Sequence, residues 1–266
     1  MTEAELEKLE EQELEETEKS TAEILALYIL LLAAMKQDLA AFFGMYAVDG
    51  LLDWAIATRR LDSKELSEFN STNGTSYKRL TRMRAFLYTL SKRVSSLEAA
   101  YIEDMTSLAK RIFKIELDAF NVNLDDLEDV IKTPWGLDEL YFGDRIKINC
   151  DKLRAQLASE VKQKIASGAK YEDVIADVEH RIEIAKRAAK NSILTESSAL
   201  NTIARHEIFK SLGITKWKYY AQRDERTCEV CGSMHGKTFL INAFEIGVTA
   251  PPLHRNCRCW CEMLVD

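Results

Sequence analysis

Residues 77–118 read YKRLTRMRAFLYTLSKRVSSLEAAYIEDMTSLAKRIFKIELD, and this stretch decides the fold class. Its apolar positions recur every three or four residues, which places them on one face of a helix: Leu80, Met83, Leu87, Leu90, Val94 and Leu97. The stretch contains neither proline nor glycine, the two residues that most often end a helix. The pattern therefore predicts a long helix from about Tyr77 to Asp118.

The same helical character extends along the chain in both directions. Proline occurs only at positions 134, 251 and 252, so the first 133 residues lack the commonest helix breaker. Residues 21–60 form a strongly apolar helical region with candidate breaks at Gly44 and Gly50, residues 70–76 are polar as loops are, and Asp125–Ile131 can form a short helix. A mainly α fold is expected.

Thr133-Pro134-Trp135-Gly136 is the clearest internal boundary, because proline disfavours helical geometry in the residue before it. Beyond it, apolar residues repeat every four positions up to Gly168, a second helix is expected from Val174, and a third from Ala185 to Leu212. We therefore predict three parts: an acidic tail (1–20), a helical N-terminal domain (21–133) and a C-terminal module (134–266) whose residues 214–266 carry most of the cysteines.

The charge of the chain is concentrated in one segment. The 266 residues include 36 Lys and Arg and 43 Asp and Glu, a net charge of −7. Residues 1–20 hold nine Glu and two Lys and so account for all of it, which leaves no basic excess for bulk phosphate binding. With only Leu6, Leu9 and Leu14 as large apolar residues, the segment is expected to be a solvated or frayed helix that the fold does not need.

Targeting signals are not evident in the sequence. The N-terminus is acidic where a secretory signal would be basic. The longest apolar run, from Ile24 to Met35, spans twelve residues, which is short for a bilayer and typical of a buried helix. We expect no membrane partner and synthesis in a reducing cytoplasm, where cysteines serve as thiols or metal ligands more often than as disulfides.

The residue pattern changes from helical to strand-like after Gly213. Lys216–Tyr220 alternates and is rich in aromatic residues, and Thr238–Ile241 and Trp260–Val265 are two further candidate strands. The expected fold is thus a helical N-terminal body followed by a C-terminal module of helices and a small zinc-stapled α+β unit.

Five of the six cysteines lie in the last 39 residues. Cys228 and Cys231 form a C-x2-C pair, a tight turn that offers two thiolates to one ion. A second pair would complete a tetrahedron, and three pairings are open: His254 with Cys257, His254 with Cys259, or Cys257 with Cys259. We expect a structural Zn2+ and favour Cys259 as the fourth ligand because of its H-x4-C spacing. Unligated thiols filling the core, or a redox role, are the alternatives.

An enzymatic role has weaker support. The sequence lacks the phosphate-binding patterns GxxxxGK[ST] and GxGxxG and the nucleophile elbow GxSxG. His206-Glu207 has Lys210 where a zinc protease needs its second histidine. An open zinc site would need a base such as Glu225, Glu229 or Glu262. We therefore expect no catalytic residues. Residues 216–220 fit base stacking or, with better support, packing of a sheet on helices.

The C-terminal half resembles a known family on several ordered segments. Pro134-Trp135 is followed by Phe142-Gly143-Asp144-Arg145-Ile146, then by Leu194-Thr195-Glu196, where the family has arginine in place of leucine. Residues 224–259 fit D-x-R-T-C-x-x-C, G-x-x-F and P-P-x-H-x-x-C-R-C. In these features the chain resembles the Mu F-like phage minor head, or head-morphogenesis, proteins over about residues 134–262.

This resemblance implies a low-copy virion protein, made in the host cytoplasm and placed inside the capsid near the portal. It implies a role in head assembly, DNA packaging or delivery. The implied partners are the portal protein, the major capsid or scaffolding protein, and packaged DNA. The alternative function is a zinc-dependent nuclease or nucleic-acid-binding effector delivered with the genome.

Overall fold

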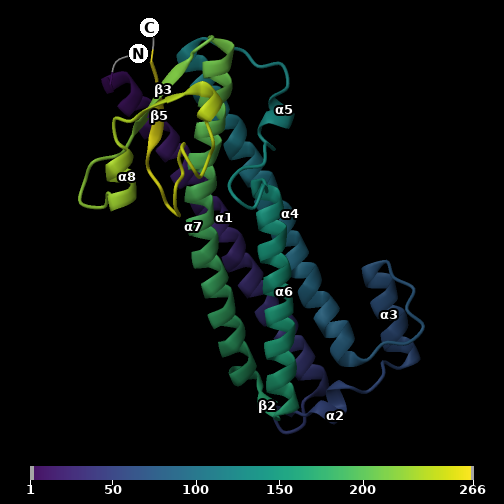
Figure 1. The fold of residues 1–266 in the computed structure, drawn as a ribbon. Helices are drawn as coiled ribbons and strands as arrows, with labels where there is room; N and C mark the ends of the chain where they lie inside the picture. The colour runs from purple at the N-terminus through teal and green to yellow at the C-terminus, as the bar shows by residue number, and fades with distance from the viewer. Residues whose placement is uncertain (1–2, 265–266) are drawn as a thin grey trace. The chain divides into compact units, whose positions relative to one another are not determined.

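Four long helices dominate the computed structural model, which describes residues 3–264. They are α1 (Glu3–Tyr46), α4 (Arg82–Phe120), α6 (Phe142–Ala166) and α7 (Tyr171–Ser211) (Figure 1). The helix predicted over 77–118 corresponds to α4. The prediction of a mainly α chain is confirmed.

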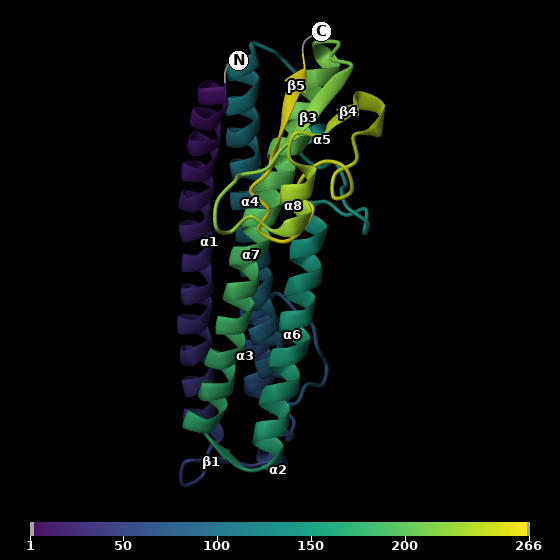
Figure 2. The same cartoon turned by 60° about the vertical axis from the view of Figure 1, so that its left-hand side comes forward.

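Short elements connect and cap these helices. Those between α1 and α6 are β1 (Leu51–Leu52), α2 (Trp54–Ala57), α3 (Ser63–Asn73) and α5 (Leu127–Val130). Those that follow α6 are β2 (Ala169–Lys170), β3 (Lys216–Tyr220), α8 (Glu229–Met234), β4 (Thr238–Leu240), η1 (Ile241–Ala243) and β5 (Trp260–Leu264) (Figure 2). The three predicted strands of the C-terminal module match β3, β4 and β5.

Helix boundaries differ from the predictions, and α4 begins at Arg82 rather than at Tyr77. α1 continues through Gly44, a position that costs about 1 kcal/mol relative to alanine and is offset by the buried neighbours Phe42 and Phe43. α3 extends into the predicted loop and ends where Gly74 takes a left-handed φ of 62°. The two helices expected after Gly168 are one helix, α7, since no glycine or proline interrupts it.

The chain divides into two compact units, and each draws on segments from both sides of residue 134. Unit 1 comprises Met1–Leu25, Tyr101–Ile146 and Arg187–Asp266, and unit 2 comprises Ala26–Ala100 and Lys147–Lys186. This division is discontinuous and differs from the linear one predicted at residue 134.

Unit 2 is built on helical stripes that the sequence shows directly. Leu153, Leu157, Val161 and Ile165 repeat every four residues along α6 and are all buried. Phe42 of α1 stacks on Phe86 of α4 with ring centroids 4.4 Å apart. β1 pairs antiparallel with β2, which joins the two segments of this unit.

Helix α1 is the one described helix that is long and apolar enough to span a membrane. By length and composition alone, Glu5–Tyr46 is apolar enough to cross a bilayer, contrary to the expectation from its longest apolar run. The core helix of a soluble protein and a signal sequence pass the same test. Met35 and Leu39 of this helix are fully buried, and 28% of its most apolar 18-residue window is buried.

The acidic N-terminal segment is part of the core of unit 1, and the expectation of a solvated helix is wrong. Its buried residues follow a helical spacing: Leu6, Leu9, Glu13, Thr17 and Ser20. A count of apolar residues misses this face because three of its five members are polar. Two of them have partners inside the unit: Asn201 of α7 donates to Glu13, and Arg111 of α4 donates to the Ser20 hydroxyl over 2.5 Å.

The buried polar face ends in a cluster around Arg205 of α7. Arg205 and Glu116 of α4 are both fully buried, with Nε and Oε1 2.8 Å apart. Arg205 Nη2 lies 2.6 Å from Glu10 Oε1, and Asn201 donates to both Glu116 and Glu13. One arginine therefore faces three carboxyl groups.

The small sheet of unit 1 has the order β4-β3-β5, with both pairings antiparallel. Trp217 and Tyr219 of β3 are fully buried, and the Trp217 ring stacks on Phe239 of β4 at 4.9 Å. These aromatic side chains pack in the core of the unit, so packing of the sheet, rather than base stacking, explains the aromatic pattern of residues 216–220.

Candidate metal centre

The C-x2-C pair opens helix α8. Cys228 is the N-cap residue, with extended backbone angles, and its sulfur accepts a hydrogen bond from the Cys231 amide at 3.4 Å. This geometry turns both sulfurs toward one point. Cys231 is buried and Cys228 is half-buried.

His254 faces both sulfurs through one ring nitrogen. Its Nε2 lies 3.2 Å from Cys228 Sγ and 3.2 Å from Cys231 Sγ. Its Nδ1 lies 2.9 Å from the Arg255 carbonyl oxygen, a contact in which Nδ1–H donates. That tautomer leaves the Nε2 lone pair directed at the sulfurs, as in histidines that bind metals.

The second half of the cluster lies deeper. Cys257 Sγ is 3.7 Å from Cys231 Sγ, and the Tyr219 hydroxyl lies 3.5 Å from Cys231 Sγ. In the described residues the ligand atoms form two groups of three that share Cys231: one with Cys228 and His254, the other with Cys257 and Cys259. The structure thus brings all five predicted ligands into one cluster.

The donor set suits zinc. A tetrahedral ion with Zn–S bonds of about 2.3 Å holds its sulfurs about 3.8 Å apart, close to the separation of Cys231 and Cys257. A four-ligand site requires Cys257 or Cys259 to approach Cys228 and His254, because no group of four lies together in the described chain. The 3.7 Å contact between Cys231 and Cys257 supports Cys257, whereas the sequence spacing favours Cys259.

The thiols of the cluster differ in acidity. A hydrogen bond from Cys259 lowers the pKa of Cys257 to about 5, and the Cys231 amide lowers the pKa of Cys228. Burial raises the pKa of Cys231 to about 11. Two of the thiols therefore favour the thiolate form that metal binding needs.

Cys261 is not part of the cluster. It is fully buried in β5, and its carbonyl oxygen accepts from Arg205 Nη1 at 3.2 Å. Cys257 and Cys259 precede β5, which begins at Trp260, so they lie outside the strand that holds Cys261.

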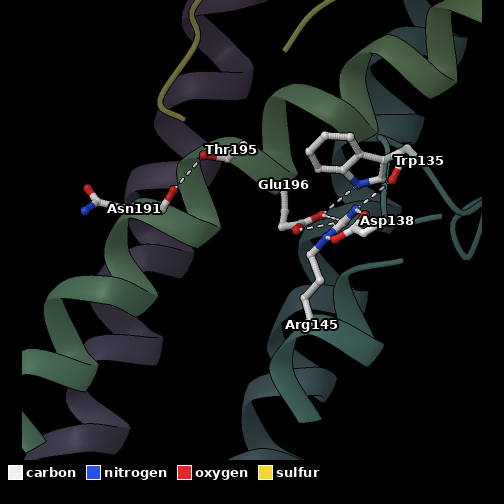
Figure 3. Close-up of polar contacts among 6 residues, drawn as sticks. All are labelled: Trp135, Asp138, Arg145, Asn191, Thr195 and Glu196. Atoms are coloured by element: carbon white, nitrogen blue, oxygen red, sulfur yellow. Dashed lines mark hydrogen bonds and ion pairs between the residues drawn. The ribbon is translucent and has the colours of Figure 1, made fainter. Parts of the chain in front are cut away.

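A second constellation joins motif residues that are far apart in sequence (Figure 3). The Glu196 carboxylate on α7 accepts from Trp135 Nε1 at 2.9 Å and from Arg145 Nη1 at 3.1 Å. Arg145 also donates to the Trp135 carbonyl oxygen and lies 4.2 Å over the Trp135 ring. Burial raises the pKa of Glu196, against the opposing effect of Arg145.

One turn earlier, α7 holds the loop that carries the candidate ligands. Asn256 lies between His254 and Cys257, and its amide donates to the Thr195 hydroxyl at 3.0 Å. Its side chain donates to Asn191 Oδ1 at 3.1 Å, while Thr195 donates back to the Asn191 carbonyl oxygen (Figure 3). These contacts position the loop that carries the candidate ligands.

The sequence analysis used Trp135, Arg145, Thr195 and Glu196 only as marks of resemblance and assigned them no role. A buried glutamate within an apolar helical stripe is a signal that a partner exists. Its partners, 51 and 61 residues away, are visible only in the fold.

The remaining candidate residues are engaged elsewhere. The His206 ring stacks on Phe244 at 4.3 Å, and His235 Nδ1 accepts from the Ala221 amide at 3.2 Å. Lys218 pairs with Glu262 across β3 and β5. None of these side chains converges on the cysteine cluster.

Comparison with known proteins agrees with the motifs. Residues 155–262 match the family model described as phage Mu protein F like protein. No curated protein and no solved structure matches the chain. The matched region contains Glu196, the cysteine cluster, β3, β4 and the first three residues of β5. Over these residues the chain is similar to the phage Mu protein F like family.

Proposed function

We propose that the protein is a minor head protein that acts inside the capsid near the portal, in head assembly, DNA packaging or delivery, by binding rather than by catalysis. The observation that carries this proposal is the Trp135–Arg145–Glu196 constellation. Its charged groups bind one another and shape a rigid module. A rigid module with internally paired charges supports a docking role.

A non-catalytic role is supported by the histidines. A hydrolase needs a base within hydrogen-bond reach of a reacting group. His206 and His235 have other contacts, and His254 faces two thiols. The proposed partners are the portal protein, the major capsid or scaffolding protein, and packaged DNA, reached after assembly in the host cytoplasm.

We further propose that Cys228, Cys231, His254 and Cys257 hold one structural Zn2+, with Cys259 as the alternative fourth ligand. When bound, the ion supplies a cross-link between the first turn of α8 and the loop at residues 254–257. The chain's own contribution is to orient these donors: the Arg255 carbonyl fixes the His254 ring, and Asn256 ties the loop to α7.

The test is co-purification with the portal protein of the same phage. Full-length chain, Cys228→Ser and the control Cys150→Ser are each expressed with a tagged portal protein. Cys150 is a lone buried thiol of unit 2. We expect the wild type and the control to co-purify with the portal and Cys228→Ser to be lost.

Two results would overturn the proposal: no association of the wild-type chain with portal or capsid protein, or metal-dependent cleavage of DNA by the purified chain. The second result would support the nuclease alternative.

A further inference from the structure

Basic residues gather in one stretch of unit 2 that has no assigned role. Between residues 55 and 92 the sequence has eight Lys and Arg against three Asp and Glu, a net charge of +5. The body of the chain beyond residue 20 is neutral, so this local excess is balanced by acidic residues elsewhere. Overall charge therefore conceals it.

The backbone brings the two ends of this stretch together. The Leu61 amide donates to the Leu80 carbonyl oxygen at 2.9 Å, and the Arg82 amide donates to that of Arg59 at 3.0 Å. Arg60 and Thr81 form the antiparallel bridge between these two bonds. The segment before α3 and the segment that leads into the first turn of α4 are therefore neighbours. We call their exposed basic residues the basic loop surface: Arg59, Arg60, Lys78, Arg79 and Arg84.

The intervening segment is held in place. Asp62 and Glu65 form a reciprocal capping box at the start of α3. At its end, the Asn70 side chain bonds both the amide and the carbonyl oxygen of Tyr77, at 3.0 and 2.9 Å. These contacts fix the loop that leads into Lys78 and Arg79, so little ordering is needed before a ligand binds.

The charges of this surface are available. All five of its side chains are exposed, and none forms an ion pair or side-chain hydrogen bond with another described residue. Arg82 differs, because it pairs with Glu65 at 3.5 Å and lies 4.2 Å over the Tyr46 ring. Tyr77, beside Lys78, keeps 42% of its surface exposed.

We propose that the basic loop surface binds the phosphate backbone of nucleic acid. Four of its five cations are arginines, whose planar fork matches phosphate oxygens. Exposed, unpaired cations without buried base-reading groups indicate binding independent of sequence. The proposal gives the packaged DNA of the proposed function a contact surface distant in sequence from the cysteine cluster, and its test does not involve the portal.

The experiment measures binding of the full chain to a 30-base-pair duplex of arbitrary sequence between 50 and 200 mM salt. Five phosphate contacts predict a slope of log K against log salt of about −4.5. The triple variant R60Q/R79Q/R84Q should reduce the slope to about −2 and weaken binding at 100 mM salt on the order of 100-fold.

The control triple K152Q/K162Q/K170Q removes the same charge from exposed residues of the same unit. It should leave the slope and the affinity within about twofold of wild type. Thermal melts verify that both triples fold, and portal co-purification should survive the R60Q/R79Q/R84Q change.

Three outcomes would overturn the proposal. They are absence of duplex binding by the wild type at 50 mM salt, equal weakening by both triples, and tighter binding of polyglutamate than of duplex. The last outcome would assign the surface to an acidic protein.

Discussion

The N-terminal segment at residues 3–20 and the C-terminal module at residues 214–264 belong to the same unit but are held by opposite means. The first looks solvated in sequence, yet it is held by contacts already present in the fold. The second is marked by a specific motif, and its core contains a cluster of cysteine sulfurs that we propose to bind a metal ion. The comparison separates stability built into the chain from stability supplied by a ligand.

Arg205 links the two regions. It pairs with Glu10 and Glu116 on one side and donates to the Cys261 carbonyl oxygen on the other. Removing either region therefore exposes the Arg205 charge, which the other region helps to bury.

The largest effect should come from removing the metal. Chelation, or Cys228→Ser, should abolish binding of one zinc per chain and the protection of residues 214–264, because structural zinc contributes on the order of 10 kcal/mol of local folding free energy. Hydrogen exchange and elemental analysis measure this. Cys150→Ser should keep its zinc. Metal-free wild type with five reactive C-terminal thiols would contradict the prediction.

Deleting residues 1–20 should come next. The deletion removes the buried Leu6 and Leu9 and takes Glu10 from Arg205, so we expect a loss of roughly 5 kcal/mol in the free energy of unfolding. The control E7Q/E11Q/E18Q changes only exposed side chains of the same segment and should stay within about 0.5 kcal/mol of wild type. Equal denaturation midpoints for the deletion variant and the wild type would instead support the prediction of a solvated helix.

The sequence was most informative where the buried face of an element consisted of apolar residues alone. The apolar stripe of α6 predicted its buried face, and the alternation of β3 predicted a strand. It was misleading where the buried face mixed residue types, because Glu13 and Ser20 are buried with partners on α7 and α4. Long-range partners are set by tertiary packing, which local periodicity does not encode.

The candidate site shows the same limit. The five residues that spacing proposed as ligands lie in one cluster, since a C-x2-C turn is a local geometry; metal binding by them stays a prediction. The choice between Cys257 and Cys259 depends on how the loop at residues 254–257 is seated on α7, through Asn256 and Thr195. The Glu196 constellation was quoted as a motif without a role for the same reason.

The third effect tests the cluster that links the two regions. Arg205→Met should cost about 3–5 kcal/mol, because it leaves buried carboxyl groups without their cation. The matched change Arg93→Met breaks the half-exposed pair with Asp38 and should cost less than about 1 kcal/mol. Urea denaturation of both variants gives the difference. Similar costs would show that burial of the cluster contributes little.

The smallest effect concerns protons in the same cluster. Burial, with Glu116 and Glu10 nearby, raises the pKa of Glu13 well above its ordinary value of 4.5. The folded chain therefore keeps a proton that the unfolded chain releases, and this contribution to stability is full below pH 4.5. It falls by about 1.4 kcal/mol per pH unit as the pH rises toward the folded pKa.

Glu13→Gln fixes the neutral form, so it should remove this slope and make the variant the more stable chain at pH 7. Glu10, Glu116, Arg205 and Cys261 are present in both proteins, and so the difference between their stability curves isolates Glu13. Urea midpoints measured from pH 4 to pH 8 provide those curves. Parallel curves for wild type and variant would mean that Glu13 is ionised in the folded chain, and the N-terminal segment would then be held by charge pairing with Arg205 rather than by a buried proton.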